Sequence, residues 1–301
     1  MAPAELKVLV SPDYMIRTVL KVYRWVNNFI REDPKGAFAP YWYRTKQGMK
    51  LMASVDFLAE RLFDIDVTNR FGGDTVRVVG EESLHDDPDL GDEHRTCVLL
   101  DMIDGTDLLQ RNFSNWCSAI VVFEPKKKEI QGAFVALRPY MYYATKTSGA
   151  FKKLLSEKNN KPIRLNGPDK ERSLRDASVC LYGQKSGNFL ELLKLNGERK
   201  FTSWLEENVE LDKKLSKNGE GEVKFRFYNL AGNPMMVRLA DGVVDTVLDT
   251  KGQAPHDVVP GVYIAVKAGA ALGKLTGEEL PLTEVESALR TPGNPGSLLK
   301  Y

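Results

Sequence analysis

Asp101 and Asp104 are the residues of this sequence best placed to do chemistry. They follow the apolar run Val98–Leu100, where a buried strand is expected to end, and Gly105-Thr106 comes directly after them. Two carboxylates held close together repel each other unless a hard divalent cation lies between them. The glycine supplies a flexible backbone, and the threonine supplies a hydroxyl that can hold a phosphate oxygen or a water molecule. We expect both carboxylates on one face of the strand end, as ligands of a metal ion.

Two further acidic segments stand at comparable places. Glu81 closes an apolar run that begins at Val76, and His256-Asp257 opens a helix-like stretch far downstream. Each signal alone also has a structural explanation, because Asp-Gly is a common turn and an Asp beside a helix start is commonly a cap. Three separated acidic signals at the ends of elements favour one shared polar centre.

Taken together, the motifs resemble those of a known enzyme family. Glu81-Glu82-Ser83, the run Asp101-Met102-Ile103-Asp104-Gly105-Thr106 and the late Asp257 are similar to the motifs of the inositol monophosphatase family. That family belongs to a wider superfamily of magnesium-dependent, lithium-sensitive phosphatases, which includes fructose-1,6-bisphosphatase and bisphosphate nucleotidases. The segments Ile130–Pro139 and Tyr143–Phe151 also look like segments of this family.

The resemblance implies a fold and a division of the chain. The fold would be an α+β layered αβαβα sandwich, with the metal ions at the junction of two subdomains. Residues 1–170 would form an N-terminal α+β subdomain with most metal ligands, and residues 171–301 a C-terminal α/β subdomain with the last one. The polar stretch Leu165–Arg175, which contains Gly167-Pro168, is the best candidate for the boundary.

The resemblance also implies the metal ligands. Glu81, Asp101 and the carbonyl of Ile103 would hold one ion, and Asp101, Asp104 and Asp257 would hold another. Asp101 would then bridge the two. The family resemblance implies two or three Mg²⁺ ions in each active site.

Catalysis would use water activated by the metal, without a phosphoenzyme. Glu81 and Thr106 would orient and activate that water, with Asp56 behind them. Gly105 and Thr106 would face the phosphate through their backbone amides, provided that a helix begins there. Asp249 would contact the alcohol part of the substrate. The remaining candidates for substrate binding are Asp104, Asp257 and Lys50.

Several residues depart from the family pattern. Lys50 and Ala53 replace an acidic and a hydroxyl residue, so that Lys50 either takes the place of a third ion or binds the phosphate. Pro260 lies within the first turns of the last helix and should distort it. His256 stands where the family has Trp, and we interpret it as a packing substitute with a metal ligand as the alternative.

The substrate stays open at this point. We expect Mg²⁺-dependent hydrolysis of a small phosphate monoester such as an inositol monophosphate. The alternatives are a 3′(2′),5′-bisphosphate nucleotidase, a fructose-1,6-bisphosphatase, or a relative without catalysis that binds metal and a phosphorylated ligand. Asp249 is shorter than the Glu that is more common in the family, so its contacts with hydroxyl groups would differ.

The bulk composition is that of a protein with a large core and no global electrostatic field. The chain has 301 residues, of which 43% are hydrophobic, with 42 basic and 41 acidic residues. A balanced charge argues against nucleic acid and anionic membranes as partners. Three cysteines in apolar runs indicate reduced thiols, and we expect a cytoplasmic protein. A homodimer is implied by the resemblance alone.

Apolar spacing and turn residues predict the elements that must position these side chains. Long helices are expected over 11–31 and 50–63, followed by strands near 75–80, 96–101, 116–124, 130–137 and 141–146. The second half is expected to contain strands near 177–181, 223–227 and 243–248, helices near 188–217 and 233–239, and the helix that Asp257 opens.

Overall fold

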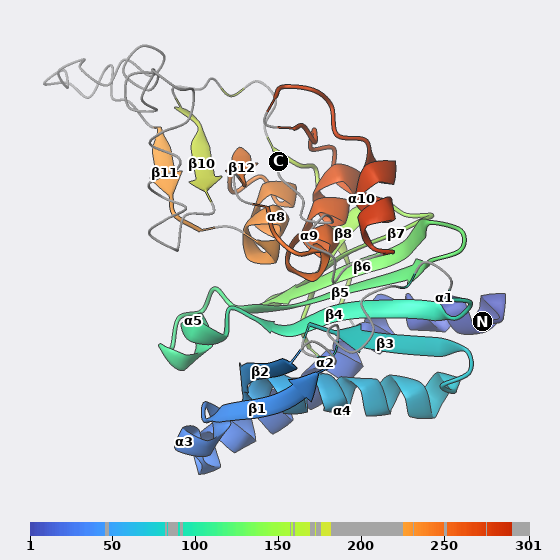
Figure 1. Ribbon diagram of the computed structural model, residues 1–301. Helices are drawn as coiled ribbons and strands as arrows, with labels where there is room; N and C mark the ends of the chain where they lie inside the picture. Colours follow the sequence, from blue (N-terminus) through green and yellow to red (C-terminus); the bar gives the residue numbers. More distant parts are fainter. Residues whose placement is uncertain are drawn as a thin grey trace, which may run out of the picture.

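The computed structural model describes residues 1–45, 48–81, 83, 90, 93–156, 158, 160–168, 172, 176–181, 225–230, 232–249, 252–274 and 276–290. Figure 1 shows the arrangement of the elements. The helices are α1 (Pro3–Leu9), α2 (Pro12–Glu32), α3 (Pro34–Ala37), α4 (Ser54–Phe71), α5 (Thr106–Gln110), α8 (Asn233–Ala240), α9 (Pro255–Lys267) and α10 (Leu282–Ala288). The strands are β1 (Pro40–Thr45), β2 (Gly48–Ala53), β3 (Val76–Gly80), β4 (Thr96–Asp104), β5 (Cys117–Glu124), β6 (Glu129–Leu137), β7 (Tyr140–Thr145), β8 (Ala150–Leu154), β9 (Ile163–Arg164), β10 (Ser178–Leu181), β11 (Arg226–Tyr228) and β12 (Thr246–Leu248).

A seven-stranded sheet in the order β3-β4-β5-β6-β7-β8-β9 forms the centre of the molecule. The pair β3 and β4 is parallel, and every later pair in this sheet is antiparallel. A smaller sheet in the order β11-β10-β12 is parallel. This agrees with the predicted sheet of mainly antiparallel neighbours.

Helices cover both faces of the large sheet. Helices α2 and α4 lie on one face and α8, α9 and α10 on the other, and the smaller sheet lies beyond α8 (Figure 1). These are four successive layers, α, β, α and β, and the fold class is the α+β sandwich that was predicted. The predicted helix over 188–217 lies outside the described residues, so the fifth layer is not described.

Alternation along β4 divides the core in two. Val98 and Leu100 are buried against α2 and α4, whereas Cys97 and Leu99 are buried against α8 and α9. Successive side chains of a strand point to opposite faces, so a strand with helices on both sides is apolar throughout. The second half of the chain therefore shares a core with the first, and the division at residue 170 stays a proposal.

Most predicted elements are confirmed within a few residues, but the helix over 50–63 is partly wrong. Residues 48–53 form strand β2, which pairs with β1 in a hairpin, and helix α4 begins only at Ser54 and runs on to Phe71. Met52 is buried and lies opposite Tyr41 in this hairpin. Pairing with the strand directly upstream, β1, overrides the local helical spacing of the apolar residues.

The cysteines, one hairpin turn and the lengths of the helices are further features of the fold. The three cysteines are free and buried. The tip of the β5–β6 hairpin carries the exposed run Lys126–Lys128, as a solvated turn should. Among the described residues, no helix has both the length and the apolar character needed to cross a bilayer.

Candidate metal centre

Four of the acidic residues predicted from the sequence, Glu81, Asp101, Asp104 and Asp257, meet at one cavity of about 460 Å³. The cavity lies at the end of β4, where the large sheet meets α5, α8 and α9. The described residues that line it are Glu81, Asp101, Ile103, Asp104, Gly105, Thr106, Asp107, Leu108, Asn115, Leu230, Gly232, Pro234, Met235, Gln253 and Asp257.

A β-bulge brings Asp101 and Asp104 to the same cavity. They are three positions apart, and a regular strand would point such side chains to opposite faces. Asp101 pairs with Ala119 and Asp104 with Cys117, so three steps along β4 match two along β5. The extra residue turns the chain between the two carboxylates, as bulges beside active sites commonly do. The predicted shared face is therefore present, but the bulge creates it.

Parallel pairing of β3 and β4 places Glu81 beside Asp101. Gly80 is in register with Leu100, and the backbone N–H of Glu81 donates to the Leu100 carbonyl at 3.0 Å. Glu81 follows directly on β3, and Asp101 is the residue of β4 next to Leu100, so the two acids lie at the same edge of the sheet. Two segments that are separated by 20 positions in the sequence thereby supply neighbouring carboxylates.

Asp101 is the most enclosed of these acids, with 7% of its surface exposed. Its Oδ1 accepts a hydrogen bond of 2.9 Å from the backbone N–H of Ile103, which fixes the direction of the carboxylate. Burial raises the pKa of Asp101 well above its usual range, and the charges of Glu81, Asp104 and Asp257 raise it further. A carboxylate in this position binds either a proton or a cation strongly.

Asp104 experiences the same effects and has one compensating contact. Burial and the neighbouring Asp257 raise its pKa to about 7, while a hydrogen bond from Asn233 opposes the shift. The side-chain amide of Asn233 donates to Asp104 Oδ2 at 3.2 Å. Asn233 is fully buried and was not predicted from the sequence. A lone Asn at the start of a helix gives no signal that separates it from an ordinary cap.

The left-handed backbone of Gly105 (φ 97°, ψ 45°) turns the chain from β4 into α5. Helix α5 begins at Thr106, as the predicted phosphate contact requires. The Thr106 Oγ1 lies 2.9 Å from Asp56 Oδ1 and 3.1 Å from the Ile103 carbonyl oxygen. A hydroxyl carries one hydrogen, so it donates to one of these oxygens at a time. Asp56 thus stands behind Thr106, where the sequence placed it.

Asp257 lies in the first turn of helix α9 and lines the cavity. His256, also in its first turn, is 6% exposed, and its Nε2 lies 3.3 Å from Asp257 Oδ1 and 4.0 Å from Glu81 Oε1. His256 is therefore more than a packing substitute for an aromatic residue, because its ring nitrogen faces two carboxylates.

Pro260 does not interrupt α9, contrary to the expected distortion. Pro260 has no N–H to donate to the carbonyl of His256, four residues back. That carbonyl accepts instead from the Asn233 amide at 2.9 Å, and the N–H of Gly261 donates to Asn233 Oδ1 at 2.9 Å. One side chain of α8 therefore satisfies the helix beside the proline and also binds Asp104.

The donor set fits a hard divalent cation. It consists of carboxylate oxygens and a backbone carbonyl, which are the ligands that Mg²⁺ and Ca²⁺ prefer. The acids are crowded enough to raise the pKa values of Asp101 and Asp104, and a bound cation would remove that repulsion. Nothing in this donor set disagrees with the ions that the resemblance implies.

One predicted site residue, Asp249, is not brought to the cavity, and the side chain of another, Lys50, is not described. Asp249 is fully buried, its Oδ1 accepts from the N–H of Gly252 at 2.9 Å, and it lies outside the cavity lining. The backbone of Lys50 is in β2 opposite Tyr43, and its side chain lies outside the described residues. Asp107, next to Thr106, also lines the cavity.

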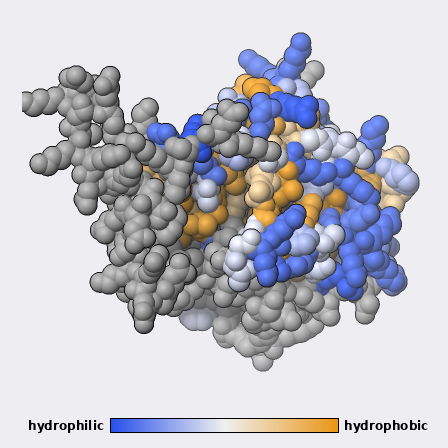
Figure 2. All heavy atoms as spheres, turned by 90° about the horizontal axis from the view of Figure 1, so that it is seen from above, coloured by the Kyte–Doolittle hydropathy of each residue, from blue (hydrophilic) through white to orange (hydrophobic). Residues whose placement is uncertain are grey.

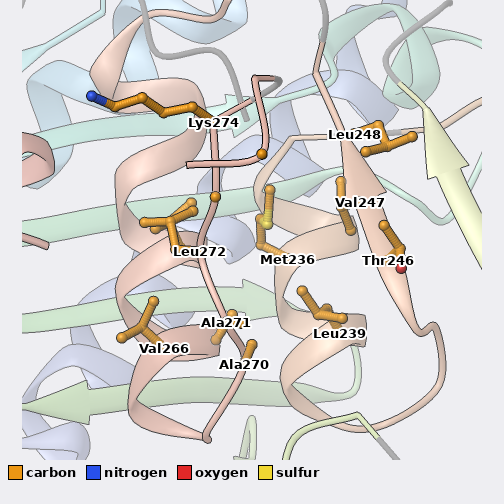
Figure 3. A pocket seen from close by; sticks show the side chains of 14 residues that line it. Met236, Leu239, Thr246, Val247, Leu248, Val266, Ala270, Ala271, Leu272 and Lys274 are labelled. Carbon is orange, nitrogen blue, oxygen red and sulfur yellow. The ribbon is translucent and has the colours of Figure 1, made fainter. Parts of the chain in front are cut away.

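A second cavity, of about 340 Å³, lies between α8, α9, β12 and residues 270–274 and 277. Figure 3 shows its mainly aliphatic lining, with Met236, Leu239 and Val247 facing one another. It shares no lining residue with the acidic cavity. The aliphatic cavity therefore offers no set of groups for phosphate chemistry. On the surface, Figure 2 shows hydrophobic side chains at the middle of the face seen from above, with hydrophilic side chains around them.

Comparison with solved structures gives a consistent set of folds. The IMPase of Thermotoga maritima has a TM-score of 0.59 at 16% identity, over 92% of this chain and 96% of that one. Inositol monophosphatase II of Staphylococcus aureus has a TM-score of 0.59 at 15% identity, over 93% and 92%. An IMPase/NADP phosphatase complexed with NADP and Ca²⁺ has a TM-score of 0.59 at 14% identity, over 93% and 87%.

Comparison of sequences, unlike comparison of structures, finds no relative of the chain. No protein-family model matches the chain, and no curated protein matches it. The structural likeness nevertheless extends over 92–93% of this chain in these three comparisons. The chain has the inositol monophosphatase fold.

Proposed function

We propose that this chain is a phosphatase that uses Mg²⁺ to hydrolyse small phosphate monoesters. The observation that carries the proposal is the meeting of four carboxylates from three separate segments, Glu81, Asp101 with Asp104, and Asp257, at one cavity. Phosphate esters resist attack because a nucleophile meets negatively charged oxygens. A site that concentrates negative charge serves this chemistry only as a holder of cations.

The ligands proposed from the sequence fit this cavity. Glu81, Asp101 and the Ile103 carbonyl would hold one Mg²⁺, and Asp101, Asp104 and Asp257 a second, with a third ion as a further option. Bound Mg²⁺ would supply charge neutralisation, a water of lowered pKa and stabilisation of the leaving oxygen. The chain contributes the fixed directions of its carboxylates, such as the hydrogen bond from Ile103 to Asp101.

Thr106 and Asp56 provide a route for the proton of the attacking water. If the Ile103 carbonyl held a cation, the Thr106 hydroxyl would donate to Asp56 Oδ1, 2.9 Å away. Its lone pairs are then free to accept a hydrogen bond from water, which orients that water towards the phosphate. Glu81 would assist as the second group that contacts the water. No covalent intermediate is required.

The phosphate would lie over Gly105 and Thr106, with Asp104 and Asp257 beside it. Related solved structures carry small phosphorylated ligands, namely 2′-AMP, inositol monophosphate and NADP, on proteins of this fold. These support the class of substrate rather than one compound. Lys50 stays a proposed phosphate contact, and Asp249 a proposed contact of the alcohol that would need a different conformation of its loop.

A panel of substrates tests the function. Inositol phosphates, fructose 1,6-bisphosphate, 3′-phosphoadenosine 5′-phosphate and p-nitrophenyl phosphate are incubated with and without Mg²⁺, and released phosphate is measured. We expect hydrolysis of at least one of them in the presence of Mg²⁺, and none after chelation. Metal binding without any hydrolysis would favour the alternative of a relative that binds metal and a phosphorylated ligand without catalysis.

The proposal also covers the location of the protein, its assembly and its partners. We propose a cytoplasmic homodimer that acts on a phosphorylated metabolite and not on nucleic acid or membranes. Light scattering coupled to gel filtration measures the mass of the assembly. A monomer at micromolar concentration would rule out the homodimer.

A further inference from the structure

His256 places a nitrogen atom within a cluster of oxygen ligands. Its Nε2, Asp257 Oδ1 and Glu81 Oε1 belong to one group in which each residue offers a ligand atom within 4.8 Å of the others. The imidazole is buried, whereas the two carboxylates are partly open to the cavity. A buried ring has few alternative positions, so its nitrogen is held towards the acids.

The spacing suits one ion in the middle of the group. Ligands at about 2.1 Å from an octahedral ion are about 3 Å apart when adjacent and about 4.2 Å apart when opposite. The distances of 3.3 Å and 4.0 Å from Nε2 to the two carboxylate oxygens fall between these limits. Small rotations of the two exposed carboxylates would complete the geometry.

The nature of the ligand decides which ion it favours. Mg²⁺ prefers oxygen ligands, whereas imidazole suits later first-row transition ions such as Ni²⁺ and Zn²⁺. We propose that His256 Nε2 is a ligand of an ion shared with Glu81 and Asp257, and that it increases the affinity of the site for divalent transition metals relative to Mg²⁺. This inference rests on the proposed function, because it concerns the same metal centre.

The competing explanation is a hydrogen bond in which His256 Nε2–H donates to Asp257. The two explanations differ in the ring nitrogen that carries the proton, since a metal ligand must offer an unprotonated Nε2. They also differ in whether the ring nitrogen is bonded to the ion. A ligand nitrogen is directly bonded to the metal, whereas the nitrogen of a hydrogen-bond donor is not.

Pulsed electron paramagnetic resonance of the Mn²⁺-loaded protein distinguishes them in the wild type. We expect modulation from a directly bound imidazole ¹⁴N, which changes to the ¹⁵N pattern when the histidines carry ¹⁵N. The matched control is His94→Gln, because His94 is exposed, and this variant should keep the signal. His256→Gln should lose it. Absence of ¹⁴N modulation from Mn²⁺-loaded wild-type protein would overturn the inference without any variant.

Calorimetric titration gives the second readout. In His256→Gln the affinity for Ni²⁺ should fall by about tenfold or more, as for the loss of a ligand, while the affinity for Mg²⁺ changes little. His256→Trp, which restores the family residue, should behave in the same way. Equal losses for both ions would show that His256 acts only on the shape or charge of the site.

The two proposals fail in different ways. Mg²⁺-dependent hydrolysis that is unchanged in His256→Gln, with no ¹⁴N signal in the wild type, would remove the inference and leave the phosphatase. Failure of the wild-type protein to bind Mg²⁺ or Mn²⁺ would contradict both proposals at once.

Discussion

The contact of Asn233 with the backbone around Pro260 can be tested by paired substitutions. Asn233→Ala removes three hydrogen bonds, to Asp104 Oδ2, to the His256 carbonyl and from the Gly261 N–H. All three involve a fully buried side chain. At about 1 kcal/mol for each bond, and more for buried groups left without a partner, the unfolding free energy should fall by about 3–5 kcal/mol.

Pro260→Ala changes the expected cost. An alanine at position 260 has an N–H that can donate to the His256 carbonyl, as in a regular helix. One of the three lost bonds is then replaced, so Asn233→Ala should cost about 1–2 kcal/mol less in the Pro260→Ala protein than in the wild type. Urea denaturation of the four proteins, without metal and at one pH, measures this difference.

The result that would refute the reasoning is additivity. If Asn233→Ala lowers the unfolding free energy equally in the wild type and in Pro260→Ala, Asn233 does not replace the hydrogen bond that the proline lacks. Asn69→Ala, at an exposed position of α4, is the matched control for replacement of an amide and should change the unfolding free energy by less than about 0.5 kcal/mol.

Further predictions concern the charges of the site. Burial raises the pKa of Asp104 to about 7, so the folded chain holds more protons than the unfolded chain between about pH 4 and pH 7. The unfolding free energy of chelator-treated protein, measured by urea denaturation, should therefore fall as pH rises through this window. Saturating Mg²⁺ should reverse this trend. An unfolding free energy that does not depend on pH would contradict the crowding of the carboxylates. If Lys50 takes the place of an ion, the double variant Lys50→Asp with Ala53→Thr should show an additional weak Mg²⁺ site in calorimetry. If Lys50 binds the phosphate, the same variant should show a higher KM and no additional site. An unchanged number of Mg²⁺ sites together with an unchanged KM would place Lys50 away from the site. Millimolar Li⁺ should lower phosphate release while Na⁺ and K⁺ do not, and equal effects of all three would indicate ionic strength alone.

The sequence predicted the parts of the fold that depend on local pattern. The central strands are continuous apolar runs because helices cover both faces of the sheet, and this made β4 and its neighbours easy to locate. The acids Glu81, Asp101 and Asp257 stand at the ends of such elements, so their meeting could be inferred from sequence. The first turn of α9 was also found at the predicted place.

The parts that were missed depend on contacts between distant segments. The hairpin partner of Lys50–Ala53 lies upstream in β1, and nothing in the local spacing reveals it. Asn233 and Pro260 are on different helices, so the side chain that compensates for the proline becomes visible only when α8 packs on α9. The bulge between Asp101 and Asp104 requires the register with β5.

The central claim is that crowded carboxylates hold the cations of a phosphatase. Its most direct test is kcat for Mg²⁺-dependent phosphate release in Asp101→Asn, compared with the wild type and with Asp74→Asn at an exposed position. We expect loss of essentially all turnover in Asp101→Asn, unchanged turnover in Asp74→Asn, and an apo stability at pH 7 that is equal to or above that of the wild type. More than about a tenth of the wild-type kcat in Asp101→Asn, a loss below ~1.4 kcal/mol in the barrier, would contradict it.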